Sequence, residues 1–80
     1  SDMKLKQNIE LYKPQFLDIE YKQFELKNNP EQKRFGVIAQ DLQKVCPELV
    51  HDNLGYLSVS YIDLLIREVA YLKEEIKKLK

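Results

Sequence analysis

The sequence predicts one α+β domain, with a small globular part followed by a long C-terminal helix that forms a parallel coiled coil. Three observations lead to this fold class. A heptad pattern fills residues 60–80. Upstream of it, apolar residues alternate in stretches typical of strands, and proline and glycine residues punctuate these stretches. With 80 residues, the chain suffices for a single domain that spans residues 1–80, and not for two.

The first half of the globular part is expected to hold one strand and one short helix. Part of the alternation lies in residues 19–26, which we expect to be extended. Residues 27–33 are polar and contain Asn-Asn-Pro, so they are predicted to be a connector. Gly36 then permits close backbone approach or a positive φ angle before a helix at residues 39–45. Pro47 ends that helix.

A β-hairpin is predicted for residues 49–59. Residues 51–55 form its loop, and residues 56–59 form the returning strand. Ser60 suits the N-cap of the last helix, and Asp63 would complete a weak capping box with it.

The last helix, residues 60–80, carries the strongest physical signal. Its apolar residues alternate in spacings of three and four, which is the a/d pattern of a coiled coil. This seam consists of Ile62, Leu65, Val69, Leu72, Ile76 and Leu79. Glu68 and Glu75 fall at g positions, and Lys73 and Lys80 fall at e positions. In a parallel coil each glutamate faces a lysine of the neighbouring copy, so the pattern favours a parallel homo-oligomer.

The same pattern also fits a single amphipathic helix packed on its own domain, because the seam spans fewer than three heptads. Leu64, Ile66 and Ala70 widen the apolar face. We therefore expect the first half of the helix to pack on its own domain and the second half to present the seam. β-branched residues at a with leucine at d favour two strands in isolated coils.

Composition argues against several classes of protein. Lysine plus arginine and aspartate plus glutamate both total 13, whereas nucleic-acid binders need an excess of positive charge. No apolar run approaches the roughly 20 residues of a membrane span. Cys46 is the only cysteine, so we expect it to be a small buried residue, with no disulfide, metal site or cofactor. A chain this short gains buried area most readily by oligomerising.

A candidate chemical site lies at the start of the chain. Ser1 is followed five residues later by Lys6, in the run SDMKLKQNI. A hydroxyl and an amine held together make a serine nucleophile without histidine. The lysine acts as base only where burial or a neighbouring positive charge, such as Lys4, lowers its pKa. An isolated pair of this kind is more often an ordinary serine beside a solvated charge.

Three further segments follow this run in order: FGVIAQDL at residues 35–42, VCPELV at 45–50 and GYLSVSY at 55–61. Together with the run and the long helix, they resemble the C-terminal intramolecular chaperone domain of phage tail spikes and tail fibres, also called peptidase S74. The resemblance covers nearly the whole chain. It implies that Ser1 is the nucleophile, that Lys6 is the base, and that the bond immediately before Ser1 is cut. A chain beginning at Ser1 would then be the released fragment.

The resemblance also implies a homotrimer joined to the upstream fibre or spike domain of the same polypeptide. The precursor would lie in the cytoplasm of the bacterial host, and the domain would be released from the mature virion. Asp2 and Asn8 belong to the same motif and are expected to hold its turn. The amide of Gln40 either assists the serine, by orienting it or donating to the oxyanion, or ties down a neighbouring loop.

Two questions stay open at this point. The serine either attacks its own preceding carbonyl in an N-to-O acyl shift or acts on a strand of a neighbouring subunit. The second question is whether the chain is catalytic at all. The alternative is a coiled-coil oligomerisation module without catalysis, which the heptad seam supports equally well. A small DNA-binding domain ranks far behind, because no helix carries the basic surface that such a domain needs.

Overall fold

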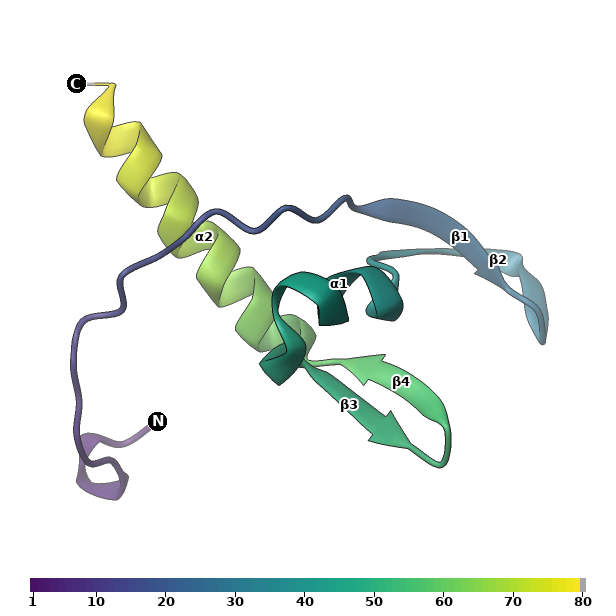
Figure 1. Ribbon diagram of the computed structural model, residues 1–80, viewed down its shortest axis with the longest axis horizontal. Coiled ribbons are helices and arrows are strands. Elements are labelled where there is room, and N and C mark those ends of the chain that lie inside the picture. The colour runs from purple at the N-terminus through teal and green to yellow at the C-terminus, as the bar shows by residue number, and fades with distance from the viewer. Residues whose placement is uncertain (80) are drawn as a thin grey trace.

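The computed structural model describes residues 1–79, which form two β-hairpins, two α-helices and two short 3₁₀ turns (Figure 1). In chain order the elements are η1 (Met3–Leu5), β1 (Lys22–Leu26), β2 (Asn29–Gly36), α1 (Ala39–Val45), η2 (Pro47–Leu49), β3 (Val50–Asn53), β4 (Tyr56–Val59) and α2 (Tyr61–Lys78). Residues 7–21, here called the arm, join η1 to β1 and cross α2 on the way (Figure 1). The predicted α+β class and the helix at residues 39–45 are confirmed.

Each hairpin is a separate antiparallel pair of strands. In the first, Phe24 lies opposite Arg34, and the register shifts near the turn. In the second, Val50 lies opposite Val59, and a two-residue turn joins the strands. Both turn residues, Leu54 and Gly55, have positive φ angles, as a tight hairpin turn requires.

The strands correct three of the sequence predictions. The connector predicted at residues 27–33 is wrong, because β2 begins at Asn29 and only residues 27–28 turn. The strand expected from residue 19 begins at Lys22, and residues 51–53, expected in a loop, belong to β3. β2 is exposed along its length except at Gly36, so its sequence does not need apolar alternation.

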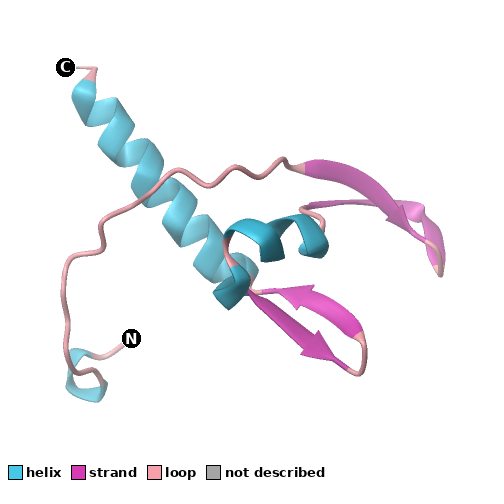
Figure 2. Ribbon diagram, viewed as in Figure 1, coloured by secondary structure: helices cyan, strands magenta, loops and turns pink. Residues whose placement is uncertain are grey.

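The core lies where α1, η2 and the second hairpin meet the start of α2 (Figure 2). Five residues are buried there: Val37, Leu42, Cys46, Leu49 and Leu64. Leu64 is fully covered, which confirms that the first half of α2 packs on its own domain. Cys46 is buried as expected. The first hairpin extends away from this core (Figure 2).

The chain is far from compact. It exposes 7403 Å² of surface, whereas a compact protein of its mass exposes about 5000 Å². Its radius of gyration is 15.7 Å, against about 12 Å for a compact domain of this length. Much of the excess is apolar, and each of the six seam residues of α2 is more than half exposed. Lys80, predicted at an e position, lies outside the described residues.

Ser60 occupies the N-cap of α2 as predicted, but its side chain does not cap the helix. Its Oγ is hydrogen-bonded to Nε2 of His51 on β3, at 2.6 Å. The capping box predicted with Asp63 is therefore absent, and the side-chain contact ties the second hairpin to the start of α2.

Gly36 confirms the close backbone approach and excludes the positive φ angle. The Tyr61 hydroxyl lies against it, accepts a hydrogen bond from the Val37 backbone N–H at 3.1 Å and donates to the Val37 carbonyl at 3.5 Å. A Cβ atom on residue 36 would collide with that hydroxyl. The end of β2 is thus fastened to the first turn of α2.

Gly36→Ala should therefore lower the free energy of unfolding by about 1–3 kcal/mol, because the added methyl group has no space. Tyr61→Phe removes the colliding oxygen, so the double variant should lose less than the sum of the two single variants. Chemical denaturation of the four proteins measures this coupling. Strictly additive losses would show that the collision is not the cause.

Candidate active site

The N-terminal turn brings Ser1 and Lys6 together. Asp2 caps η1, because its Oδ1 accepts a hydrogen bond from the Lys4 N–H at 2.9 Å. Backbone bonds from Leu5 to Asp2 and from Lys6 to Met3, both 3.1 Å long, close the turn. Asn8 then reverses the chain with a φ angle of 54°, a conformation that asparagine tolerates better than most residues.

Across this turn, Nζ of Lys6 donates a hydrogen bond to Oγ of Ser1 at 2.8 Å. The distance is within the range in which a general base serves a nucleophile. An uncharged amine at the same place would accept the hydroxyl proton, leaving Oγ free to attack a carbonyl carbon. Both side chains are exposed in the single chain, so the proton transfer requires a cover that excludes water.

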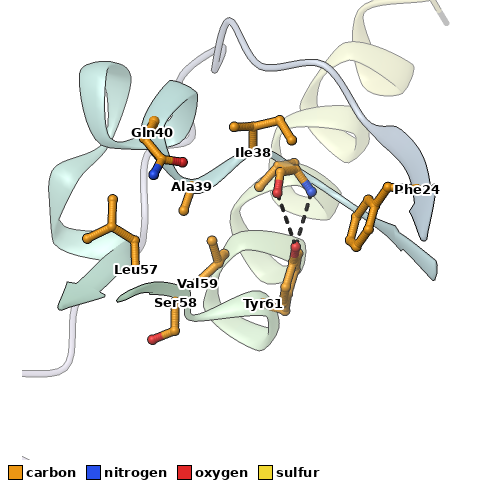
Figure 3. Close-up of a pocket in the computed structure, with 9 residues that line it drawn as sticks. Phe24, Ile38, Ala39, Gln40, Leu57, Ser58, Val59 and Tyr61 are labelled. Atoms are coloured by element: carbon orange, nitrogen blue, oxygen red, sulfur yellow. Dashed lines mark hydrogen bonds between the residues drawn. The ribbon is translucent and has the colours of Figure 1, made fainter. Parts of the chain in front are cut away.

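Gln40 is not part of this pair. It is the second residue of α1 and lines an open cavity of about 400 Å³ with β4 and the start of α2 (Figure 3). Figure 3 shows Gln40 and Leu57 at one end of this cavity and Phe24 and Tyr61 at the other. The N-terminal turn stands clear of α1 (Figure 1), so a single chain does not bring Gln40 to the serine.

A second polar cluster centres on Arg67 of α2. Its Nη1 donates to Sγ of Cys46 at 3.1 Å and to Oε2 of Glu48 at 3.2 Å. Its guanidinium carbon also lies 5.9 Å from the centre of the Tyr12 ring, within cation–π range. Burial raises the pKa of the Cys46 thiol. Sequence reasoning missed this cluster, because its members come from three elements and share no local spacing.

Glu48 has a pKa below its ordinary value. A hydrogen bond from its own backbone N–H is the largest cause, and the hydrogen bond from Arg67 adds to it. Both interactions favour the charged carboxylate. Glu48 thereby holds one side of the Arg67 guanidinium in place.

The arm makes two further contacts with α2. The Tyr21 hydroxyl donates to Oε2 of Glu68 at 2.7 Å, and the Phe16 ring meets the edge of Tyr71 with centroids 5.8 Å apart. Burial and the Glu68 carboxylate raise the pKa of Tyr21. Glu68, predicted to face a lysine of a neighbouring copy, thus has a partner in its own chain. Glu75, the other g residue, accepts a hydrogen bond from Lys78 at 3.2 Å.

Neither a metal site nor a membrane span is found in the part of the chain that the structure describes. Within residues 1–79, no three histidine, cysteine or acidic side chains gather as metal ligands. None of the helices there is both long and apolar enough to cross a bilayer.

Comparison with known proteins places the chain in a family. The sequence model of Peptidase_S74, described as chaperone of endosialidase, matches residues 1–51, which is more than half of the chain. The match includes the N-terminal turn, the arm, the first hairpin and α1, and it ends before β4 and α2. No curated protein and no solved structure matched the chain.

Glu48→Gln should lower the melting temperature at pH 7, and the loss should be smaller near pH 3. A folded-state pKa below the ordinary glutamate value of about 4.3 stabilises the fold above that value. The contribution is lost as the pH falls through the lower folded-state pKa. Thermal unfolding at both pH values measures it, with Glu31→Gln on exposed β2 as the matched control. An equal loss at both pH values would contradict the assigned role.

Proposed function

We propose a function from the premise that this chain belongs to the Peptidase_S74 family, the chaperone of endosialidase. The chain acts as an intramolecular chaperone at the end of a longer fibrous polypeptide. It associates as a homotrimer, aligns three upstream fibre or spike domains, and then releases itself by cutting the bond before Ser1. Its setting is the assembly of a phage tail fibre or tail spike in the cytoplasm of the bacterial host, with release of the domain from the mature virion.

The observation that carries the cleavage step is the 2.8 Å contact between Lys6 Nζ and Ser1 Oγ. In the precursor, a neutral Lys6 takes the proton from the Ser1 hydroxyl, and Oγ attacks the carbonyl carbon of the residue before Ser1. The peptide C–N bond breaks, the Ser1 nitrogen gains the proton, and the upstream chain is held as an ester on Oγ. Water then hydrolyses the ester, which releases a carboxylate and restores the hydroxyl.

This order of bond making suits a serine that attacks its own preceding carbonyl, because the acyl group only moves from the nitrogen to the oxygen of one residue. Attack on a strand of a neighbouring subunit is the other route. Mixed trimers of an active and a Ser1→Ala precursor separate the two routes. Attack within one chain leaves the Ser1→Ala copies intact, whereas attack between subunits cuts them.

Because Ser1 and Lys6 are exposed in the single chain, we expect that assembly of the trimer activates them. A lysine amine is neutral near pH 7 only where water is excluded or another cation is close. The turn is open to water in the single chain, so the upstream segment or neighbouring copies must supply the cover. Cleavage would then follow trimer assembly.

The seam of α2 supports the trimer. Its apolar residues are each more than half exposed in the single chain, and the molecule exposes roughly half as much surface again as a compact protein of its mass. Three parallel helices would cover the seam. Three strands, in preference to the two that the a and d residues favour, are taken from the resemblance to the family.

The proposed sequence of events is physically economical. Intertwined β-rich fibres have distant contacts and nucleate slowly. A helical trimer at one end raises the local concentration of the three chains and sets their register. Cleavage of the chaperone domain afterwards makes assembly irreversible and leaves the fibre kinetically trapped.

The second candidate function is a coiled-coil oligomerisation module without catalysis. The exposed seam favours it independently of the N-terminal turn. Self-cleavage distinguishes the two functions, because a passive module leaves the precursor intact.

A precursor that carries 50–100 natural upstream residues, roughly a small domain of chain, should yield a fragment beginning at Ser1. Ser1→Ala should abolish the reaction, and Lys6→Met should slow it at least about 100-fold, because the general base is lost. Lys13→Met on the exposed arm is the matched control and should cleave like the parent. Intact mass over time reports the result. An uncut parent with a folded upstream part would favour the passive module.

The seam is tested separately by the oligomeric state. Val69→Asp places a charge at the centre of the seam and should convert the trimer to monomer at micromolar concentration. Leu54→Asp, at the exposed tip of the second hairpin, should leave the trimer intact. Sedimentation velocity measures both variants. A trimeric Val69→Asp protein would exclude the seam as the interface.

A further inference from the structure

The arm is fastened to one face of α2 by three aromatic contacts. Tyr12 lies over Arg67, Tyr21 donates to Glu68, and Phe16 meets Tyr71. Residues 67, 68 and 71 lie on one side of the helix, because residue 71 is four positions from residue 67 and three from residue 68. The seam residues occupy the adjacent face. The arm also borders part of the seam, because Leu65, Val69 and Leu72 line an open groove with it. Each of these three seam residues is still more than half exposed.

Arg67 is the point at which the arm, the core and the last helix meet. Its three partners come from two distant parts of the chain: Tyr12 from the arm, and Cys46 and Glu48 from the junction of α1 and η2. The Arg67 side chain is 29% exposed and that of Glu48 is 59% exposed, so the arginine is the more covered of the two. A planar guanidinium uses its edge for hydrogen bonds while its face takes an aromatic ring, which explains how one residue serves all three partners.

The contact of Tyr12 with Arg67 also limits where the Ser1–Lys6 turn can move. Tyr12 is six positions after Lys6 in the sequence, a stretch of chain that spans about 20 Å at full extension. Once Tyr12 is held on Arg67, the Ser1–Lys6 turn can move only within about 20 Å of Tyr12. Arg67 lies on α2, which follows all the other described elements in the chain, so the clamp connects the N-terminal turn to α2.

We propose that Arg67 is a positioning residue for self-cleavage: it clamps Tyr12, and with it the Ser1–Lys6 turn, onto a folded α2. Cleavage therefore becomes efficient only after the C-terminal helix has formed and packed on the core. This role rests on the proposed self-cleavage. Cleavage would then depend on correct folding, because a polypeptide in which α2 is missing or unpacked would not cut off its chaperone domain.

The test compares cleavage rates of the full precursor. Arg67→Gln should cleave about tenfold more slowly than the parent, since the arm loses its cation–π contact. Arg34→Gln, which removes an exposed arginine from β2, should cleave at the parental rate. Tyr12→Leu should be slowed like Arg67→Gln, and Tyr12→Phe, which keeps the ring, should not be slowed. The Arg67→Gln/Tyr12→Leu double variant should be no slower than the slower single variant, because both changes break one contact.

A second measurement does not depend on cleavage. In the isolated 80-residue chain, the backbone order parameters of residues 7–16 should fall in Arg67→Gln and Tyr12→Leu and stay unchanged in Tyr12→Phe. Tyr12 is outside the core and about half exposed, so Tyr12→Leu should keep the parental melting temperature. This variant keeps the test decisive even if Arg67→Gln unfolds the protein.

The outcomes separate the clamp from the proposed function. An intact parent precursor rejects self-cleavage, and this role of Arg67 with it. A cleaving parent with a Tyr12→Leu variant at the parental rate rejects the role of Arg67 alone. Additive losses in the double variant, or slow cleavage with an undisturbed arm, would also overturn the inference. Slow cleavage with a disordered arm and a parental melting temperature supports it.

Discussion

Packing of Leu64 in the small core is the constraint on which the other parts of the structure depend. This one fully buried residue of α2 joins the helix to the cluster formed by Leu42, Cys46 and Leu49. With only five buried hydrophobic side chains among the described residues, the core cannot also cover the arm, the first hairpin or the seam. A chain with so little interior gains further stability by burying its outer surfaces against other chains. The small core and the exposed seam thus have one physical origin.

Different residues of α2 make three kinds of contact surface. Leu64 faces the core, residues 67, 68 and 71 hold the arm, and the seam from Ile62 to Leu79 remains open. Leu64 and residues 67, 68 and 71 follow the spacing of one helix face, so the core and the arm share that side of α2. Leu65, Val69 and Leu72 of the seam border the arm, so a neighbouring helix would pack beside it. The arrangement fits the proposed function, in which one helix supports the fold, positions the cleavage turn and joins three copies.

Local features of the chain were predictable and long-range ones were not. The helix at residues 39–45 follows from Gly36 and Pro47, and the pairing of Ser1 with Lys6 depends on a turn of only six residues. The β1–β2 ribbon was missed over most of β2, because a ribbon exposed on both faces needs no alternation. The sequence placed Glu68 opposite a neighbouring copy, whereas Tyr21, 47 residues away in the sequence, reaches it first. No local pattern records such a contact.

The sequence by itself determined the elements whose signals are local: the α+β class, the heptad seam, the short helix and the N-terminal turn with its candidate nucleophile and base. Periodicity, glycine, proline and short spacings act over a few residues, so they can be recognised without a fold. Only the tertiary structure decided which face of α2 meets the core and which meets the arm, that Gln40 lies away from Ser1, and that Arg67 joins three parts of the chain. These outcomes depend on how distant segments pack, and packing is settled by shape and burial in three dimensions.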